Sequence, residues 1–474
     1  MSYALYVGKA HSSTGHAWLG GYGDEPSSHW LEIVPRLHHA KDAAITVGVT
    51  PDAAMPGLLS EIPETSETAR HIRVSYSHYL GVPAPLTNGG LNEHGVAVRD
   101  VWSTSRAELI AMTPRDQTGP NYSDLARIVV QRAKTAREGV ELIGALIAEH
   151  GYSTYGGNSH LIADPDEAWV VVECAGGAGI WAAERLGPED IRASRPGYIG
   201  VVEIGGDGFL HPPHLTDLAE RMGWWRPGEP FDFNKIYGDG KGRWEGVRWI
   251  EAEMRKRAAR PEKIGLHDMF WAVRTERLTG DTAGYGQVVP LTHPAHDECR
   301  ALWHAHVGAI ASPFSPVFMG AETVPEEFRA HRYLTSGESA RFEDERFVDR
   351  GEPETLSIIP QGIESTRAAT AVFKRLTYLV MQHPDRFFGE VVQTWEGMER
   401  KRARDAIDAA RTAHVLIEQG EAALARRNLT RASSAALLEA LDVAEALAAS
   451  IEARTRAIYG IDDDPAPKSF DQIW

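Results

Sequence analysis

The chain has 474 residues, of which 43% are hydrophobic and 24% charged, a composition typical of a globular protein with a substantial core. Its net charge of −17 argues against a general binder of nucleic acid or acidic membranes. The two cysteines, Cys174 and Cys299, exclude a four-cysteine zinc site and argue against a disulfide framework. No signal-like run opens the chain and no apolar segment approaches the ~20 residues that span a bilayer, so we expect a cytoplasmic protein.

The first predicted element is a strand over residues 2–8. Tyr3, Leu5 and Val7 alternate with smaller residues, the period-two pattern of a strand. Ser2 opens this strand directly behind Met1. If Met1 is removed, a hydroxyl nucleophile and an α-amine with a pKa of about 7.7–8.0 share one residue, a known catalytic arrangement. A Met-Ser start is common, so the position alone decides nothing.

Strands and a helical block are predicted to fill the rest of the first two hundred residues. Ser123 is the expected N-cap of one helix, and a second helix follows Thr135 and ends at Gly151. The turn Gly176–Gly179 is expected to join two strands, because it lacks the order of a phosphate-binding loop. The further strands are predicted at 44–49, 72–76, 95–98, 160–163, 168–173 and 198–204.

The second half of the chain is predicted to be largely helical. Residues 224–303 are expected to hold loops and two helices, 241–258 and 266–277, and residues 312–362 to be irregular. Helices are then predicted at 366–382, 386–419 and 433–459, the last two separated near Arg427-Asn-Leu-Thr. They form an expected helical hairpin that packs on the body or on a second copy, which predicts a homo-oligomer through these C-terminal helices.

Five segments resemble those of one known family in the same order along the chain. Individually each is weak, but together they cover nearly the whole chain. The segments are Asn92-Glu-His-Gly-Val-Ala, Thr135-Ala-Arg-Glu-Gly-Val-Glu-Leu-Ile, Ile162-Ala-Asp-Pro-Asp-Glu-Ala-Trp-Val-Val-Val-Glu, Phe231-Asp-Phe-Asn-Lys-Ile-Tyr-Gly, and the stretch Val372–Glu399 with Trp395. The chain thus resembles the dipeptidase/secernin family of N-terminal nucleophile hydrolases.

The resemblance implies an α/β fold, a four-layer αββα sandwich with a C-terminal helical extension. We expect a catalytic domain over residues 1–362 and a helical region over 363–474. The family cleaves amide bonds of dipeptides with a Cys at the mature N-terminus, and Ser2 matches that Cys. Serine keeps the same chemistry but is less acidic than a thiol, so it needs more assistance.

Other positions of the family site match less well. Asp24, after Gly20-Gly21-Tyr22-Gly23, matches the family Asp that orients and charge-stabilises the α-amine. A family Arg three residues earlier is Gly21 here. A family Asn falls at Arg195, in a register that can slip by one, and Arg195 is a candidate to replace the charge missing at Gly21 if the two strands are neighbours. An ordinary surface arginine is the equal alternative.

Four further residues are candidates for substrate or oxyanion contacts: Asn92, Trp102, Asn158 and His160. For Asn158 and His160 a satisfied structural role is the stronger alternative.

No metal or cofactor is predicted. His211/His214, His293/His296 and His304/His306 have spacings seen in ligand sets, but none lies in a His-Glu-x-x-His pattern. Cys174 is expected to be a buried apolar group, and the aromatic pairs Trp224-Trp225 and Phe231/Phe233 to pack in the core.

The sequence therefore predicts an amide-bond hydrolase for a small amide or peptide, with Ser2 as nucleophile. Its runner-up is an inactive family member that acts as a binding or regulatory protein. A third interpretation is a metal hydrolase built on the histidines.

Overall fold

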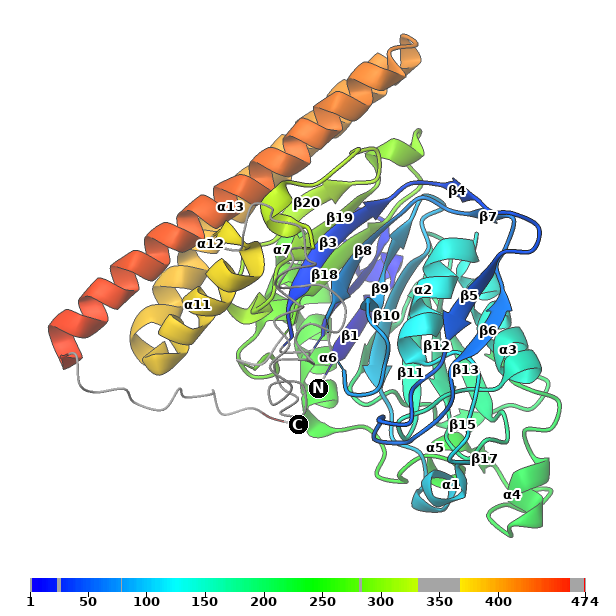
Figure 1. Ribbon diagram of the computed structural model, residues 1–474. Helices are drawn as coiled ribbons and strands as arrows, with labels where there is room; N and C mark the ends of the chain where they lie inside the picture. Colours follow the sequence, from blue (N-terminus) through cyan, green and yellow to red (C-terminus); the bar gives the residue numbers. More distant parts are fainter. Residues whose placement is uncertain are drawn as a thin grey trace, which may run out of the picture.

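The computed structural model describes residues 2–23, 27–77, 79–280, 284–330, 367–460 and 473. It is a mixed α/β structure in which two antiparallel sheets pack face to face (Figure 1). In the six-stranded sheet the strand order is β14 (Ile191–Ser194), β1 (Tyr3–Val7), β2 (Ala17–Tyr22), β18 (Gly286–Leu291), β19 (Ala301–Ala305) and β20 (Ser315–Phe318).

The second large sheet has eight strands and is formed mostly by the first half of the chain. Its order is β16 (Phe209–Leu210), β13 (Trp181–Leu186), β12 (Ala168–Glu173), β11 (Asn158–Ala163), β10 (Ala97–Trp102), β9 (Leu86–Asn92), β8 (His71–Tyr76) and β3 (His29–Val34). Three two-stranded ribbons accompany it, namely β4 (Leu37–His38) with β7 (Glu67–Thr68), β5 (Ala44–Val47) with β6 (Ser60–Pro63), and β15 (Val201–Val202) with β17 (Phe231–Asp232).

Helices cover the outer faces of both large sheets. On the eight-stranded sheet lie α2 (Tyr122–Arg132) and α3 (Ala136–His150), and on the six-stranded sheet α6 (Glu245–Ala258) and α7 (Leu266–Arg274). Shorter helices are α1 (Ala107–Met112), α4 (Asp217–Arg221) and α5 (Phe233–Ile236), and 3₁₀ turns span Lys9–His11, Asp297–Cys299, Ala309–Ala311 and Glu326–Phe328.

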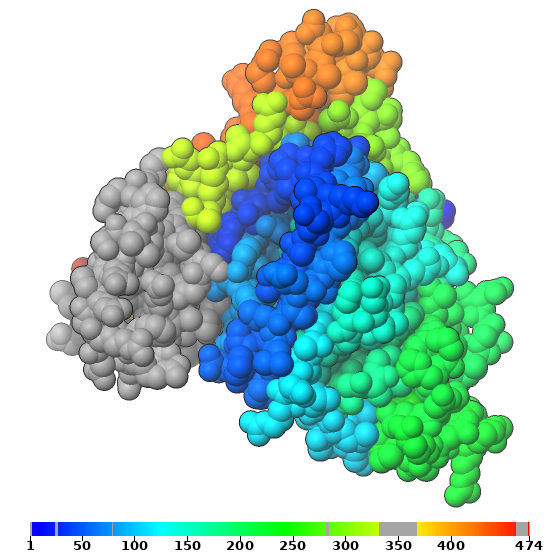
Figure 2. Space-filling view, turned by 45° about the vertical axis from the view of Figure 1, so that its right-hand side comes forward, coloured from blue at the N-terminus to red at the C-terminus, as the bar shows by residue number. Residues whose placement is uncertain are grey.

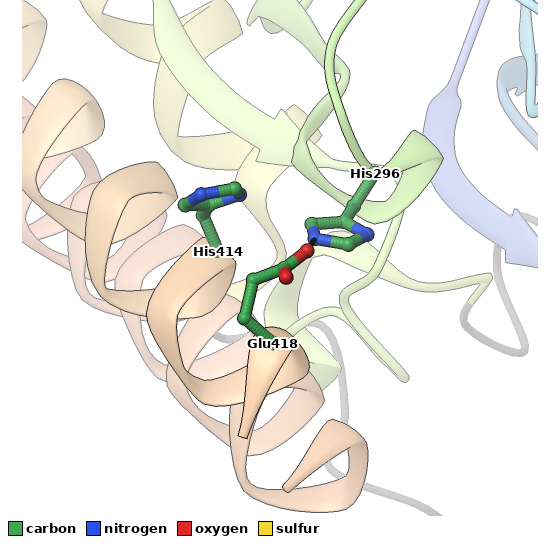
Figure 3. A group of neighbouring side chains, drawn as sticks. All are labelled: His296, His414 and Glu418. Atoms are coloured by element: carbon green, nitrogen blue, oxygen red, sulfur yellow. Dashed lines mark ion pairs between the residues drawn. The ribbon is translucent and has the colours of Figure 1, made fainter. Parts of the chain in front are cut away.

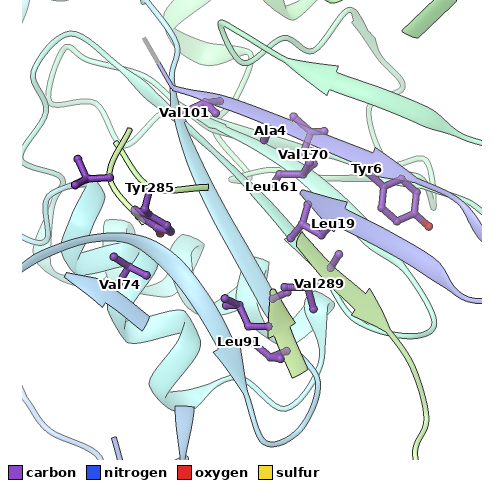
Figure 4. Packing of buried hydrophobic residues seen from close by; sticks show 14 of the residues in the cluster. Ala4, Tyr6, Leu19, Val74, Leu91, Val101, Leu161, Val170, Tyr285 and Val289 are labelled. Atoms are coloured by element: carbon purple, nitrogen blue, oxygen red, sulfur yellow. The ribbon is translucent and has the colours of Figure 1, made fainter. Parts of the chain in front are cut away.

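The largest apolar core lies between the two sheets (Figure 4). Ala4 and Leu19 of the six-stranded sheet and Val101 and Leu161 of the eight-stranded sheet are buried in it. Fully burying a Val or Leu side chain stabilises the folded state by about 1.5–3 kcal/mol. Because side chains alternate along a strand, each sheet presents its other face to the helices.

The C-terminal region consists of α11 (Ala369–Gln382), α12 (Pro384–Glu418) and α13 (Ala422–Tyr459). The last two form a long antiparallel hairpin along the edge strand β20 (Figure 1). Its tip (orange) projects at one end of the molecule, and the α4 segment (green) lies at the opposite end (Figure 2). Trp395 is fully buried and donates from Nε1 to Ala311 O at 2.8 Å. The expected domain boundary at residue 362 lies outside the described residues.

Among the described residues, no helix combines the length and the apolar character needed to cross a membrane. This holds even for α12 and α13, whose 35 and 38 residues are rich in charge.

Several predicted elements are confirmed. The first strand covers residues 3–7, α3 is capped by Thr135 and followed by Gly151, and β11 and β12 form the expected hairpin. Cys174 is buried, and burial raises the pKa of its thiol well above the ordinary value. Phe231 and Phe233 pack in the core as expected, as does the partly buried pair Trp224-Trp225.

The predicted N-cap of α2 was wrong by two residues. Asn121 caps the helix, because its Oδ1 accepts from Ser123 N at 2.8 Å and Asp124 N at 3.0 Å. Ser123 lies inside the first turn, where its Oγ accepts from Thr87 N at 2.8 Å.

The predicted break in the C-terminal hairpin was also misplaced. The turn lies at Gly420, whose φ of +81° favours glycine, and the Arg427-Asn-Leu-Thr segment continues the helix. Asn428 is compatible with the helix interior because its side chain donates to Ala409 O of α12 at 3.2 Å.

Strands β18, β19 and β20 replace structure that was predicted as loop or irregular. Two prolines obscured their pattern. Pro316 lies in the edge strand β20, and Pro290 lies in β18 beyond the three residues that pair with β19. Both positions tolerate the missing amide hydrogen. The strand predicted over 198–204 is reduced to Val201–Val202.

Candidate active site

Ser2 stands at the start of β1, in the interior of the six-stranded sheet. Tyr3 pairs with Tyr22 of β2, and Ala4 pairs with Ser194 of β14. Continuing this register places Ser2 beside Gly23 on one side and Pro196 on the other. The residue is partly buried. Ser2 is therefore carried by a strand that is hydrogen-bonded on both edges, the kind of rigid support a nucleophile needs.

Alternation along β1 determines which way Ser2 faces. Ala4 and Tyr6 belong to the core between the two sheets, whereas Tyr3 and Leu5 belong to the core beneath α6 and α7. Ser2 has the parity of Ala4 and thus lies on the face toward the other sheet.

The Gly20–Gly23 segment of β2 runs close beside β1. A Cβ on Gly21 would lie 2.2 Å from Tyr3 O, so no side chain fits there without a shift of the backbone. Gly23 N donates to Tyr285 O at 3.0 Å, which links the end of β2 to the start of β18. Asp24 lies outside the described residues.

Arg195 does not replace the charge missing at Gly21. β1 separates β14 from β2, and Arg195 has the parity of Tyr3, on the face toward α6 and α7. It is 6% exposed, and its Nη1 donates to the hydroxyl of Tyr22 and, at 3.3 Å, to Leu278 O. Burial lowers the pKa of Arg195 to about 10, and Tyr22 opposes that shift.

Ser194, one residue earlier, faces the side where Ser2 lies. It pairs with Ala4, is 1% exposed, and its Oγ has no hydrogen-bond partner among the described residues. A slip of one residue in the sequence register would place the family Asn at Ser194, which has a hydroxyl and not an amide.

Trp102 lies at the end of β10, close to the segment that flanks Ser2. Its carbonyl oxygen accepts from Gly197 N at 3.0 Å, and Gly197 follows Pro196. The indole is partly exposed and meets Trp244 edge-on, with 6.1 Å between ring centroids. The two indoles offer an apolar wall at this end of the sheets.

Asn92 is structural, contrary to its predicted role at a substrate or oxyanion. Its Nδ2 donates to Val130 O at 3.1 Å and Ala133 O at 2.7 Å, and its Oδ1 accepts from His94 N and Val96 N, both at 3.0 Å. All four contacts are with backbone, so the amide ties the turn after β9 to the end of α2 and has no capacity left for a ligand.

His160 is also structural. It shares the parity of Ile162, on the face toward α2 and α3, away from Ser2. Its Nδ1 lies 2.7 Å from Glu173 Oε1 and its Nε2 lies 3.0 Å from Tyr122 O, and both side chains of the pair are fully buried. Two acceptors at the two ring nitrogens require the imidazolium form.

Asn158 lies on the same face as His160. Its amide contacts Tyr155 Oη at 2.8 Å in either orientation. The orientation that also satisfies both of its ends donates to Val101 O at 2.9 Å and accepts from Ser159 N at 3.2 Å. The structural alternative therefore holds for both residues.

The three histidine pairs do not form the metal sites that their spacings suggested. His211 and His214 contact backbone carbonyls, of Pro212 at 3.0 Å and of Ala178 at 3.0 Å. His304 and His306 are buried and hydrogen-bonded to each other at 3.0 Å.

His293 and His296 separate as well. His293 pairs with Asp166, while His296 meets His414 and Glu418, which lie one turn apart on α12 (Figure 3). The ligand atoms of His296, His414 and Glu418 all lie within 4.8 Å of one another, and this is the arrangement among the described residues that can hold a divalent cation. It lies on the helical hairpin, not at Ser2.

A hollow of about 430 Å³ lies beyond the end of β10, between the segment 104–110 and the loop 235–240. Arg106 and Lys235 line it, and Ser2 does not. The hollow lies past Trp102, beyond the end of β10, and is not a pocket around Ser2.

Comparison with known proteins identifies a peptidase-like segment in the middle of the chain. The model of peptidase family C69 matches residues 70–244. Probable dipeptidase B of Lactococcus lactis subsp. lactis (strain IL1403) is 33% identical over 134 residues, 28% of this chain and 27% of that protein. Probable dipeptidase A of Streptococcus pyogenes serotype M3 (strain SSI-1) is 28% identical over 123 residues, 26% of this chain and 25% of that protein.

The chain thus spans about a quarter of the length of the curated relatives it matches. These matches agree with the resemblance to the dipeptidase family over that part of the chain. The family match contains Asn92, Trp102, Asn158, His160 and Arg195, but neither Ser2 nor Asp24.

Solved structures of a mutant and of a variant of the conjugated bile acid hydrolase from Clostridium perfringens also match. Each is 12% identical; they cover 65% and 64% of this chain and 89% of their own, with TM-scores of 0.28 and 0.27.

Proposed function

We propose that the protein is an N-terminal nucleophile hydrolase that cleaves an amide bond in a small acylated amine or peptide, with Ser2 as nucleophile. The observation that carries the proposal is the place of Ser2, at the start of an interior strand and on the face between the two sheets. The sequence of layers, with helices outside two facing sheets, is consistent with the αββα sandwich of that class. The similarity to peptidase family C69 supports the same chemistry.

In the proposed reaction the Ser2 hydroxyl attacks the substrate carbonyl carbon while its proton passes to the α-amine of the same residue. The tetrahedral intermediate then collapses. The carbon–nitrogen bond breaks, the departing amine takes the proton, and an ester remains on Ser2. A water molecule attacks this ester, the α-amine again carries the proton, and the acid is released with the hydroxyl restored.

The oxyanion must be held by groups other than those the sequence suggested, because Asn92, Asn158 and His160 are fully engaged. We assign this role to the Ser194 hydroxyl, which is buried on the Ser2 face and has no other partner among the described residues. Trp102 pairs with Asn158 and shares its face of the sheet, so we assign no substrate contact to it. Asp24 keeps its proposed role of orienting the α-amine and raising its basicity.

The intact mass of the purified protein tests this proposal, before and after exposure to p-nitrophenyl acetate. We expect a mass without Met1 and one acetyl adduct, which the variant Ser2→Ala loses and the variant Ser13→Ala, at an exposed serine of the same region, retains. Ser194→Ala should keep the fold and slow acylation by about 10²-fold, the scale of losing one oxyanion donor. Retention of Met1 together with no adduct would instead favour the binding or regulatory interpretation.

A further inference from the structure

Arg99 is a fully buried arginine in the layer between the two sheets. It lies on β10 between Ala97 and Val101 in the side-chain alternation, and both of these belong to the core that faces β1 and β2. Its exposure is 0%. A guanidinium carries its charge at any physiological pH, so this apolar layer contains a permanent cation.

The guanidinium has no polar partner among the described residues. None of Nε, Nη1 and Nη2 makes a hydrogen bond, and the recorded contact is with the face of the Tyr285 ring, 4.8 Å from Cζ to the centroid. The other buried arginines differ. Arg274 is ion-paired with Glu399, and Arg402 donates to Phe314 O at 3.3 Å and Ser315 Oγ at 3.2 Å.

Two buried histidines border the same tyrosine ring, and each has an acceptor atom without a partner among the described residues. The centroids of His29 and His304 lie 5.9 and 6.0 Å from that of Tyr285. His29 Nδ1 lies 2.8 Å from Ser27 O, so in the neutral ring it carries the hydrogen and Nε2 is an acceptor. Among the described residues this Nε2 has no partner.

The tautomer of His304 follows from the hydroxyl of Thr370. That hydroxyl donates to His29 O at 2.6 Å, so it accepts from His306 Nε2 at 3.0 Å. His306 Nδ1 then accepts from His304 Nε2 at 3.0 Å, which leaves His304 Nδ1 as an acceptor without a described partner. Burial lowers the pKa of both His29 and His304 to about 3, which keeps both rings neutral.

This group of side chains lies at the end of the sheets where Ser2 stands. Tyr285 O accepts from Gly23 N, and Gly23 is beside Ser2 in the register of β1 and β2. With neighbouring strands ~4.8 Å apart, the backbones of Ser2 and Tyr285 are separated by about 10 Å. A substrate held at Arg99 can therefore reach Ser2 with a chain of several bonds.

We propose that Arg99 binds a carboxylate of the substrate and thereby restricts the enzyme to acidic amides. A carboxylate matches the planar fork of the guanidinium with two parallel hydrogen bonds. The acceptor nitrogens of His29 and His304 suit an N–H or O–H group beside that carboxylate. The inference names the substrate class of the proposed hydrolase and rests on that function.

Binding is measured on the full chain carrying Ser2→Ala, so that turnover plays no part. The probes for calorimetry are N-acetylglycine and N-acetylglycinamide, which differ in having a carboxylate or a carboxamide. We expect N-acetylglycine to bind at least about tenfold more tightly, the scale of one charge-assisted hydrogen bond. Arg99→Met should abolish the difference and Arg99→Lys should restore part of it. Equal responses to the two probes, including none to either, would overturn the proposal.

Stability provides the second measurement. Because the Arg99 charge is buried and has no polar partner in the part of the chain that the structure describes, Arg99→Met should leave the melting temperature unchanged or raise it. The matched control Arg274→Met, which leaves Glu399 unpaired in the core, should lower it. A structural role for Arg99 predicts instead that Arg99→Met lowers the melting temperature, as Arg274→Met does. Failure of the proposed function would appear separately, as an absent acetyl adduct on Ser2 with carboxylate binding intact.

Discussion

The buried pair of His160 and Glu173 provides a direct test of how the structure assigns charge. Both side chains are fully buried, and both ring nitrogens of His160 face acceptors, the Glu173 carboxylate and Tyr122 O. Glu173→Gln keeps the size of the side chain and removes its charge. The variant therefore leaves an imidazolium buried without a counter-ion or forces the ring to lose a proton.

The pH dependence of this effect has a defined sign. Burial alone would lower the pKa of His160, but the Glu173 carboxylate raises it above the usual 6.5. A histidine with a raised pKa in the folded state adds stability that is fully present below the unfolded pKa. This contribution is lost as the pH rises through the folded value. In Glu173→Gln the strongest of the groups that raise this pKa is gone, while Asp100 and Tyr122 O remain, so the dependence should weaken.

Removing one partner of a buried ion pair costs about 3–5 kcal/mol. We expect urea unfolding, followed by tryptophan fluorescence at pH 6, to show a loss of about this size in Glu173→Gln. At pH 9 the gap to the wild type should be smaller. Asp166→Asn is the matched control, because its pair with His293 is exposed and such pairs contribute little.

A gap that stays constant between pH 6 and pH 9 would refute the assignment of His160 as an imidazolium. So would a Glu173→Gln variant as stable as the Asp166→Asn control at pH 6, because then the pair would carry no net charge interaction.

Three further predictions concern the residues around Ser2. Asn92→Ala removes four hydrogen bonds and should lower the free energy of unfolding by about 3 kcal/mol, while acetylation of Ser2 per folded molecule, measured by intact mass, stays unchanged. Ser2→Cys supplies a more acidic nucleophile and should react with iodoacetamide at residue 2 faster than the cysteines of the wild type, whose thiols are held at raised pKa by burial. Arg195→Ala leaves the Tyr22 hydroxyl with fewer partners and should lower the melting temperature without changing the affinity for N-acetylglycine; a lost affinity with an unchanged melting temperature would return Arg195 to the substrate site.

The elements that sequence could predict are those whose signals are local. The alternation in β1, the cap of α3 at Thr135 and the β11–β12 hairpin depend on residues close in the chain, and the structure confirms them. Strands β18 and β20 were missed because Pro290 and Pro316 are tolerated only through their positions at the limits of strand pairing. That information lies in the neighbouring strands and not in the segment itself.

The face of a strand was the main obstacle to predicting the site. In β10 both faces are buried, since Val98 packs under the helices and Val101 packs between the sheets. A polar residue on such a strand gives no indication of the side on which it lies. His160 and Asn158 were therefore proposed for the site, although both lie on the face away from Ser2. Arg99 was overlooked for the same reason, because neither its burial nor its missing partner can be seen in the sequence.

The proposed carboxylate contact also bears on why a hydroxyl can replace a thiol at position 2. A serine is a weaker nucleophile than a cysteine, so the reaction must gain from positioning what it loses in intrinsic reactivity. Holding both ends of a substrate raises the effective concentration of the reacting group, and such gains reach several orders of magnitude when the geometry is rigid. Arg99 on one sheet and Ser2 on the other would fix a substrate at two points across the layer between them. The same rigidity restricts the substrates to those with a carboxylate at the matching distance, so in this proposal the weaker nucleophile and the narrower specificity have one structural cause.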